Sequence, residues 1–267
     1  MIPLSTKMRP YNLDDFEGQG HFMYKGSLLY NSIKNKTFDS AIFFGPSGTG
    51  KTTLARIIAN ETDADFHELN ASVSGIKELK EIIDGAKTKF FGLQKETTYV
   101  YVDEFHRWNK LQQDSLLKAL EEGAIRFIGS TTENPYFAVN NSVLSRVRSI
   151  YEFKRLTRDE ILRILNKAIA DPDKGFGGLE LKFKDSELRI IADMSGGDAR
   201  VALDTLGFII DNSDEGKEID LKIIEEAMQR QTTFYDKSED KYNLLSGKNA
   251  SQVRLLSSNS RKNIPFA

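Results

Sequence analysis

The sequence predicts an α/β domain, in which helices flank a parallel sheet, followed by a small all-helical domain. A glycine-rich loop joins an apolar run to a helical pattern within residues 41–59. From there to residue 153, strand-like and helical stretches alternate, which is typical of parallel sheets. Beyond residue 155 only helical patterns remain. We therefore expect domains over 1–154 and 155–230, with 231–267 starting a C-terminal region.

Composition limits the class of protein. The 267 residues are 39% hydrophobic and 28% charged, enough to bury a substantial core. No apolar run approaches bilayer-spanning length, and the N-terminus lacks an apolar signal core, so we expect a cytoplasmic protein without a membrane partner. The absence of cysteine excludes thiolate metal sites. Because the net charge is only -2, any DNA contact would need a local basic patch.

Residues 45–52 fit the phosphate-loop pattern G-x-x-x-x-G-K-[ST] at every fixed position. The preceding apolar run, 41–44, predicts a buried strand, and a helix is expected to begin at Lys51. Lys51 would reach the β- and γ-phosphates of ATP, and the Thr52 hydroxyl would ligate Mg²⁺. The alternative is a glycine-rich turn that matches by chance. The nucleotide-binding residues expected here are Gly45, Pro46, Ser47, Gly48, Thr49, Gly50, Lys51, Thr52 and Thr53.

A second decisive stretch is the β-rich run 98–104, which ends in two acids as a Walker B strand does. Asp103 would hold Mg²⁺ through water. Glu104 would orient and polarise the water that attacks the nucleotide. The alternative is a strand that ends in solvated acids.

The other elements follow from apolar spacing. We expect residues 1–24 to be irregular. Polar residues 130–135 end one strand, where open α/β sheets bind ligands. Helices are expected over 26–36, 75–90, 110–122, 157–170, 185–195, 198–212 and 219–229, and strands over 65–70, 124–129 and 150–153.

The order of these motifs resembles AAA+ ATPases of the clamp-loader-like branch. Three passages, 103–114, 128–135 and 195–200, look like the D-E-I-H-R-F-N-K-x-Q-Q-D, I-G-A-T-T-E-N-P and S-G-G-D-A-R segments of the replication-associated recombination protein family (RarA, also MgsA). Met8-Arg9-Pro10 and Gly18-Gln19-x-His21 match its N-terminal signature. The resemblance covers roughly residues 3–246. It implies an AAA+ P-loop NTPase domain with a helical lid.

The resemblance also implies roles for individual residues. Thr132 matches sensor 1, which senses the γ-phosphate and water, although a capping threonine is the alternative. Arg146 matches the arginine finger that acts on a neighbouring subunit's nucleotide, with Arg148 as its competitor. Arg200 matches sensor 2, which places a lid guanidinium on the phosphates. The turn at Gly18 and Gln19 would border the adenine, and Asn70 is a weaker candidate for coupling DNA contact to Glu104.

The sequence departs from the family at several points. Ser47 replaces the second proline of G-P-P-G-T-G-K-T, and Val201 replaces a second arginine. Residues 247–267 are rich in Ser, Asn and Lys without helical period, where the family continues into a tetramer-forming region. We expect a truncated or frame-shifted product with a disordered tail, which puts self-association in doubt.

The implied function is a DNA-stimulated ATPase that acts at stalled or damaged replication forks with single-strand-binding protein as a partner. A clamp-loader subunit, a Holliday-junction branch-migration motor and a nucleotide-binding structural subunit without turnover are the alternatives. Lys87, Lys89 and Lys95 around Phe90-Phe91 form a basic and aromatic cluster that could contact single-stranded, gapped or forked DNA. The alternative is a solvated face over two core phenylalanines, and His106, Arg107 and Lys110 are other candidates.

Overall fold

The predicted site lies at the carboxyl ends of the strands of a parallel sheet. The computed structural model describes residues 2–91, 97–179, 184–213 and 223–227. Within them, five strands are ordered β2-β3-β4-β1-β5, and every neighbouring pair is parallel. The strands are β1 (Ala41–Phe44), β2 (Asp65–Asn70), β3 (Thr98–Asp103), β4 (Arg126–Thr131) and β5 (Ser149–Glu152). The expected α/β class with a parallel sheet is confirmed.

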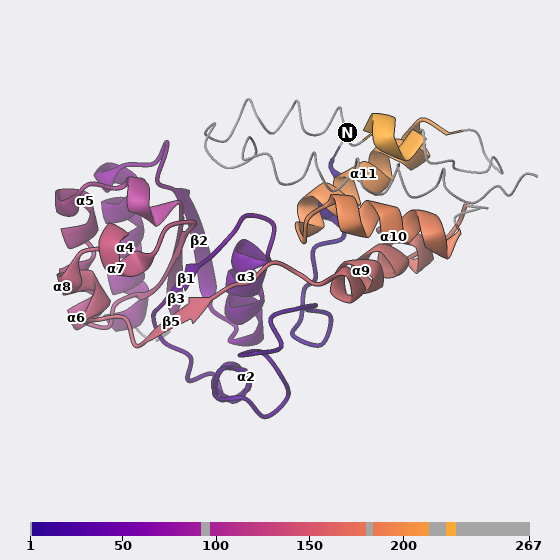
Figure 1. Ribbon diagram of the computed structural model, residues 1–267. Helices are drawn as coiled ribbons and strands as arrows, with labels where there is room; N and C mark the ends of the chain where they lie inside the picture. The colour runs from indigo at the N-terminus through magenta and orange to yellow at the C-terminus, as the bar shows by residue number, and fades with distance from the viewer. Residues whose placement is uncertain (1, 92–96, 180–183, 214–222, 228–267) are drawn as a thin grey trace, which may run out of the picture. The chain divides into compact units, whose positions relative to one another are not determined.

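Each face of the sheet is buried against its own helices. Tyr99 and Tyr101 of β3 face a core that includes Leu54 and Ile58, whereas Val100 and Val102 face the opposite core. This division follows from the two-residue period of a strand. Residues of α2 (Leu28–Lys34) and α3 (Lys51–Glu61) contribute to the first core, and residues of α4 (Ile76–Phe91), η1 (Phe105–Arg107), α6 (Leu117–Glu121) and α8 (Asn141–Leu144) to the second. Two further short helices, α5 (Lys110–Asp114) and α7 (Pro135–Ala138), lie on the side of the second core (Figure 1).

The helical part after β5 contains α9 (Arg158–Ala170), α10 (Asp185–Met194) and α11 (Ala199–Asp211). Thr157 begins α9 with a capping box, because its side chain accepts from the Glu160 N–H while the Glu160 carboxylate accepts from the Thr157 N–H. Of the expected helix over 219–229, only 223–227 are described, and these are helical. The expected tail over 231–267 lies outside the described residues. The exact domain boundaries stay a prediction.

Three local expectations were wrong. The expected helix over 110–122 is broken into α5 and α6, because the Leu116 N–H donates to the Gln113 carbonyl (3.2 Å), three residues back rather than four. The strand expected at residue 124 begins two residues later, since the Ala124 N–H still bonds the carbonyl of Ala119 on α6 (3.1 Å).

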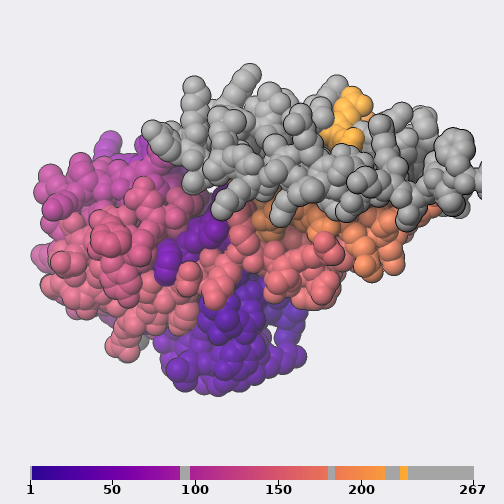
Figure 2. Space-filling model, viewed as in Figure 1, coloured from indigo at the N-terminus to yellow at the C-terminus, as the bar shows by residue number. Residues whose placement is uncertain are grey.

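Residues 1–24 also contain a short helix, α1 (Leu4–Lys7), where an irregular segment was expected. It forms because it packs on α11: the Ser5 N–H and hydroxyl both donate to the Asp204 carboxylate, at 2.9 and 3.0 Å. Other segments that are far apart in the sequence also lie side by side. In Figure 2, residues from early in the chain, in purple, lie beside residues from its middle, in rose. Among the described helices, none has the length and apolar character needed to cross a bilayer.

Candidate nucleotide-binding site

The phosphate loop joins β1 to α3 at the carboxyl edge of the sheet, as expected. It is anchored to the neighbouring strand, because the Gly45 N–H donates to the carbonyl of Thr131 on β4 (3.1 Å). A Cβ at Gly45, which has φ +138°, would overlap the carbonyl of Phe153. Only glycine therefore fits where the backbone leaves β1 for the loop.

Lys51 is buried inside this loop. Its ammonium donates to the carbonyls of Gly45 (2.7 Å) and Pro46 (2.8 Å). Burial lowers the pKa of Lys51 to about 8, and the carboxylates of Asp103 and Glu104 oppose that shift only in part. Among the described residues no carboxylate forms an ion pair with this buried ammonium, and a bound polyphosphate would supply that anionic partner, so the residues present fit ATP.

The two predicted Mg²⁺ ligands are brought together by a tyrosine. The Tyr101 hydroxyl lies 2.8 Å from the Thr52 hydroxyl and 3.1 Å from the Asp103 carboxylate. It also lies 2.9 Å from the hydroxyl of Ser130 on β4, which itself donates to Asp103. One hydroxyl and one carboxylate are hard oxygen ligands of the kind that Mg²⁺ prefers, and Mg²⁺ usually takes its remaining ligands from water and phosphate. The residues present therefore fit the metal as well.

Glu104 follows β3 in the left-handed region, with φ +53°, and its carboxylate lies near an imidazole. His106 Nε2 is 3.4 Å from Glu104 Oε2 and 3.8 Å from Glu133 Oε1, and Nδ1 is 2.9 Å from the hydroxyl of Thr131. Burial raises the pKa of Glu104, and His106 opposes this rise. The imidazole thus links the predicted catalytic acid to the end of β4.

Thr132, the predicted sensor, lies one residue beyond β4 with its side chain exposed. Its neighbour Thr131 is buried, and the Thr131 hydroxyl contacts His106 and accepts from the Glu133 N–H (3.0 Å). Sequence reasoning missed the roles of Tyr101, Ser130 and Thr131. For Tyr101 a signal existed, since residues two apart on a strand share a face, and Asp103 is the second residue after it.

The helical part contacts the phosphate loop through Asp198, another residue to which the sequence analysis assigned no role. Asp198 caps α11, accepting from the Arg200 N–H (2.9 Å) and the Val201 N–H (3.1 Å). The same carboxylate accepts from the Ser47 hydroxyl (3.2 Å), and the Ala199 N–H donates to the Gly48 carbonyl (3.0 Å). A serine at position 47 therefore makes a lid contact that a proline could not make.

Arg200 lies in the first turn of α11 with its side chain exposed. Its charge is among the causes that lower the pKa of Lys51, so it lies within electrostatic range of the loop. Gln19 is buried beside the loop, where its side chain amide donates to the carbonyls of Thr49 (3.2 Å) and Lys154 (2.8 Å). Gly18 precedes it with φ +93° and packs against Leu156.

Arg146 follows α8 and is held away from the loop of its own chain. It forms an ion pair with Glu121 and donates to the Ser142 carbonyl (2.8 Å). Its competitor Arg148 pairs with Asp39 (2.9 Å). Among the described contacts of Arg146 and Arg148, none involves a residue of the phosphate loop.

The side chains that were weaker candidates for contact with DNA bind other residues of the protein. Lys87 pairs with Glu122 (2.6 Å) and Lys89 with Asp65 (2.6 Å), which favours a solvated face, while Lys95 lies outside the described residues. The side-chain oxygen of Asn70, Oδ1, accepts from the Ser72 N–H (2.8 Å). The Glu104 carboxylate lies instead beside the imidazole of His106 (3.4 Å).

Comparison with known proteins agrees with this architecture. Residues 8–140 match the family described as Holliday junction DNA helicase RuvB P-loop domain, and residues 177–247 match the AAA C-terminal domain. The Thermotoga maritima RuvB Holliday junction branch migration motor has a similar fold, with a TM-score of 0.66 and 26% identity over 84% of this chain and 73% of that one.

Curated relatives are more similar in sequence. Replication-associated recombination protein A of Haemophilus influenzae is 43% identical over 91% of this chain, and that of Bacillus subtilis is 34% identical over 92%. The chain spans about half the length of these relatives, 55% and 58%. With the fold and the site in place, this similarity confirms the resemblance found in the sequence: the chain belongs to the replication-associated recombination protein A family of AAA+ P-loop ATPases.

Proposed function

We propose that this chain is a DNA-dependent ATPase that acts in replication-fork maintenance, recombination and repair. The observation that carries the proposal is the convergence at one sheet edge of three parts. The first part is the buried ammonium of Lys51 in the phosphate loop, and the second is the pair of Thr52 and Asp103, which Tyr101 joins. The third is the carboxylate of Glu104, which contacts His106. A phosphate loop, a metal-ligand pair and an acid for the attacking water are what nucleotide hydrolysis requires.

The residues would divide the work as follows. The loop N–H groups and Lys51 hold the β- and γ-phosphates of ATP, and Thr52 and Asp103 hold Mg²⁺. Bound Mg²⁺ neutralises phosphate charge. Glu104 orients a water for attack on the γ-phosphorus, which breaks the bond to the ADP oxygen and yields ADP and phosphate. His106 holds the Glu104 carboxylate, and Thr132, one residue beyond β4, is the residue to which we assign the sensing of the γ-phosphate.

Two arginines would complete the site. We propose that Arg200 contacts the phosphates from the lid, and that Arg146 leaves Glu121 to act on a neighbouring subunit's nucleotide. A guanidinium supplied in trans stabilises charge on the transferred phosphoryl group, by about 10³–10⁵ in rate where characterised. This role requires self-association. Single-strand-binding protein as a partner and a cytoplasmic location belong to the same proposal.

Steady-state ATP hydrolysis tests the function, measured with and without forked or gapped DNA beside Glu104→Gln. We expect DNA to stimulate turnover in the wild type, and we expect Glu104→Gln to bind ATP but lose turnover. Turnover that survives in Glu104→Gln would contradict the assignment of the acid. ATP binding without any wild-type turnover would favour a structural subunit, and sizing the protein in solution would then tell whether a neighbour is missing.

A further inference from the structure

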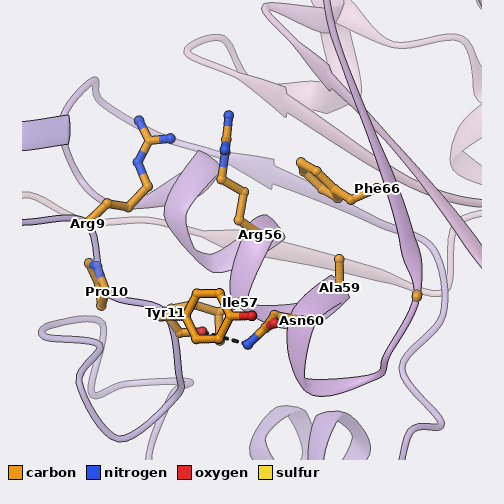
Figure 3. Close-up of a pocket in the computed structure, with 9 residues that line it drawn as sticks. Arg9, Pro10, Tyr11, Arg56, Ile57, Ala59, Asn60 and Phe66 are labelled. Atoms are coloured by element: carbon orange, nitrogen blue, oxygen red, sulfur yellow. Dashed lines mark hydrogen bonds between the residues drawn. The ribbon is translucent and has the colours of Figure 1, made fainter. Parts of the chain in front are cut away.

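A pocket lies beside α3, the helix that follows the phosphate loop, and its lining residues are not among those assigned to the nucleotide. It encloses about 320 Å³, which is at the lower end of the range for ligand pockets. Its wall combines the N-terminal segment, the second half of α3 and the start of β2 (Figure 3). The residues that line it include Arg9, Tyr11, Arg56, Ile57, Asn60 and Phe66.

Arg9 is the unusual member of this pocket. Its guanidinium is half-buried, and within the described residues no carboxylate lies at ion-pair distance from it. Burial, and then repulsion by Arg56, lower the pKa of Arg9 below its usual range. A partly desolvated cation without a partner is costly to fold, and such groups are concentrated at functional sites. Arg9 belongs to the Met8-Arg9-Pro10 part of the N-terminal signature, and the proposed hydrolysis gives that part no task.

Arg56 adds a second guanidinium with donors to spare. It pairs with Glu68 and lies over the Phe66 ring, 5.9 Å from its centroid. In Figure 3, the side chains of Arg9 and Arg56 extend in the same direction. Since a guanidinium has five N–H donors, one carboxylate leaves several available. The pocket therefore offers two planar cations to an oxyanion.

The remaining wall suits a flat ring. Tyr11 is 67% exposed, which is unusual for a large aromatic side chain, and Ile57, Ala59 and Phe66 add apolar surface. The Asn60 side chain donates to the Tyr11 carbonyl (3.1 Å), which fixes that part of the wall. A phosphate next to a base needs cations and an aromatic surface, and this pocket has both.

We propose that this pocket binds one nucleotide of a single-stranded nucleic acid, with its phosphate on Arg9 and Arg56 and its base against Tyr11. The inference rests on the proposed action on DNA. A phosphodiester strand fits better than a peptide, because the charged groups of the wall are all donors. A peptide backbone would also need acceptors for its N–H groups.

Fluorescence anisotropy with a labelled oligo-dT, in the presence of ADP, tests the site on the full chain. We expect Arg9→Ala and Tyr11→Ala each to weaken the affinity about tenfold, and Tyr11→Phe to retain it. Loss of one phosphate contact should also reduce the salt dependence of log K by about 0.7. The matched control is Arg158→Ala, which removes an exposed arginine paired with Asp193. Circular dichroism checks folding, and Arg9→Lys, which keeps the charge without the fork, should give an intermediate affinity.

Affinities of Arg9→Ala and Tyr11→Ala equal to that of Arg158→Ala would overturn the site. A second result would also overturn it. In that result, Arg9→Ala loses binding to a labelled acidic peptide that ends in an apolar residue but still binds oligo-dT as the wild type does. Wild-type turnover without any oligo-dT binding would overturn this inference and leave ATP hydrolysis standing. Oligo-dT binding that depends on Arg9, without ATP turnover, would support the pocket and reject the ATPase.

Discussion

Gly48→Ala is expected to separate the lid from the phosphate loop. A Cβ at Gly48 would overlap the Asp198 carboxylate. Three losses follow. An alanine held at φ +65° costs about 1 kcal/mol. Displacing the Asp198 cap of α11 from the N–H groups of Arg200 and Val201 costs about 1 kcal/mol. Losing the hydrogen bond from Ser47 costs about 1 kcal/mol more. Together they amount to about 3 kcal/mol in the free energy of unfolding.

Urea denaturation without nucleotide measures this cost, because the contact is present in the nucleotide-free chain. Gly123→Ala is the matched control, since Gly123 has nearly the same φ, +67°, and a Cβ there meets nothing within 4 Å. It should cost only the backbone contribution, about 1 kcal/mol. Equal losses in the two variants would falsify the reasoning, because they would mean that Asp198 does not rest on the loop.

Three further predictions concern the site and the sheet. Tyr101→Phe removes the hydroxyl shared by the two predicted Mg²⁺ ligands and should raise the Mg²⁺ concentration needed for half-maximal hydrolysis about fivefold, which a magnesium titration would measure. His106→Ala should lower kcat at least tenfold with little change in KM for ATP, whereas equal losses in nucleotide affinity would point to a structural role. A hydrogen bond from Lys89 holds the pKa of Asp65 below its usual 3.8, so the wild type should exceed Asp65→Asn in stability by about 0.5–1 kcal/mol above that pH. That difference should shrink as pH falls and the carboxylate is protonated, and a difference that persists at pH 2 would contradict it.

Local patterns predicted the elements and the chemistry that lies within single stretches. The loop at residues 45–52 and the acids at 103 and 104 could be placed because glycine, lysine and carboxylate requirements are written into consecutive positions. Helix ends were less certain, as α5 and α6 show, since a switch to a three-residue hydrogen bond leaves the apolar spacing of 110–122 almost unchanged.

Contacts between distant residues could not be predicted in this way. Nothing in the spacing of Ser47 and Asp198, which are 151 positions apart, indicates that their side chains form a hydrogen bond. The network around Tyr101 and the contact of Thr131 with His106 depend likewise on which strands become neighbours. Sequence order does not give this sheet order, because β1 lies between β4 and β5.

The N-terminal segment gives the helical part a second attachment. Ser5 is bound to Asp204 on α11, while farther along the segment the Leu13 N–H donates to the carboxylate of Glu61 on α3 (3.2 Å). The chain itself crosses between the same two parts once more, from β5 to α9. Because the N-terminal segment contacts both parts, it restricts rotation of the helical part relative to the sheet in addition to the β5–α9 connection.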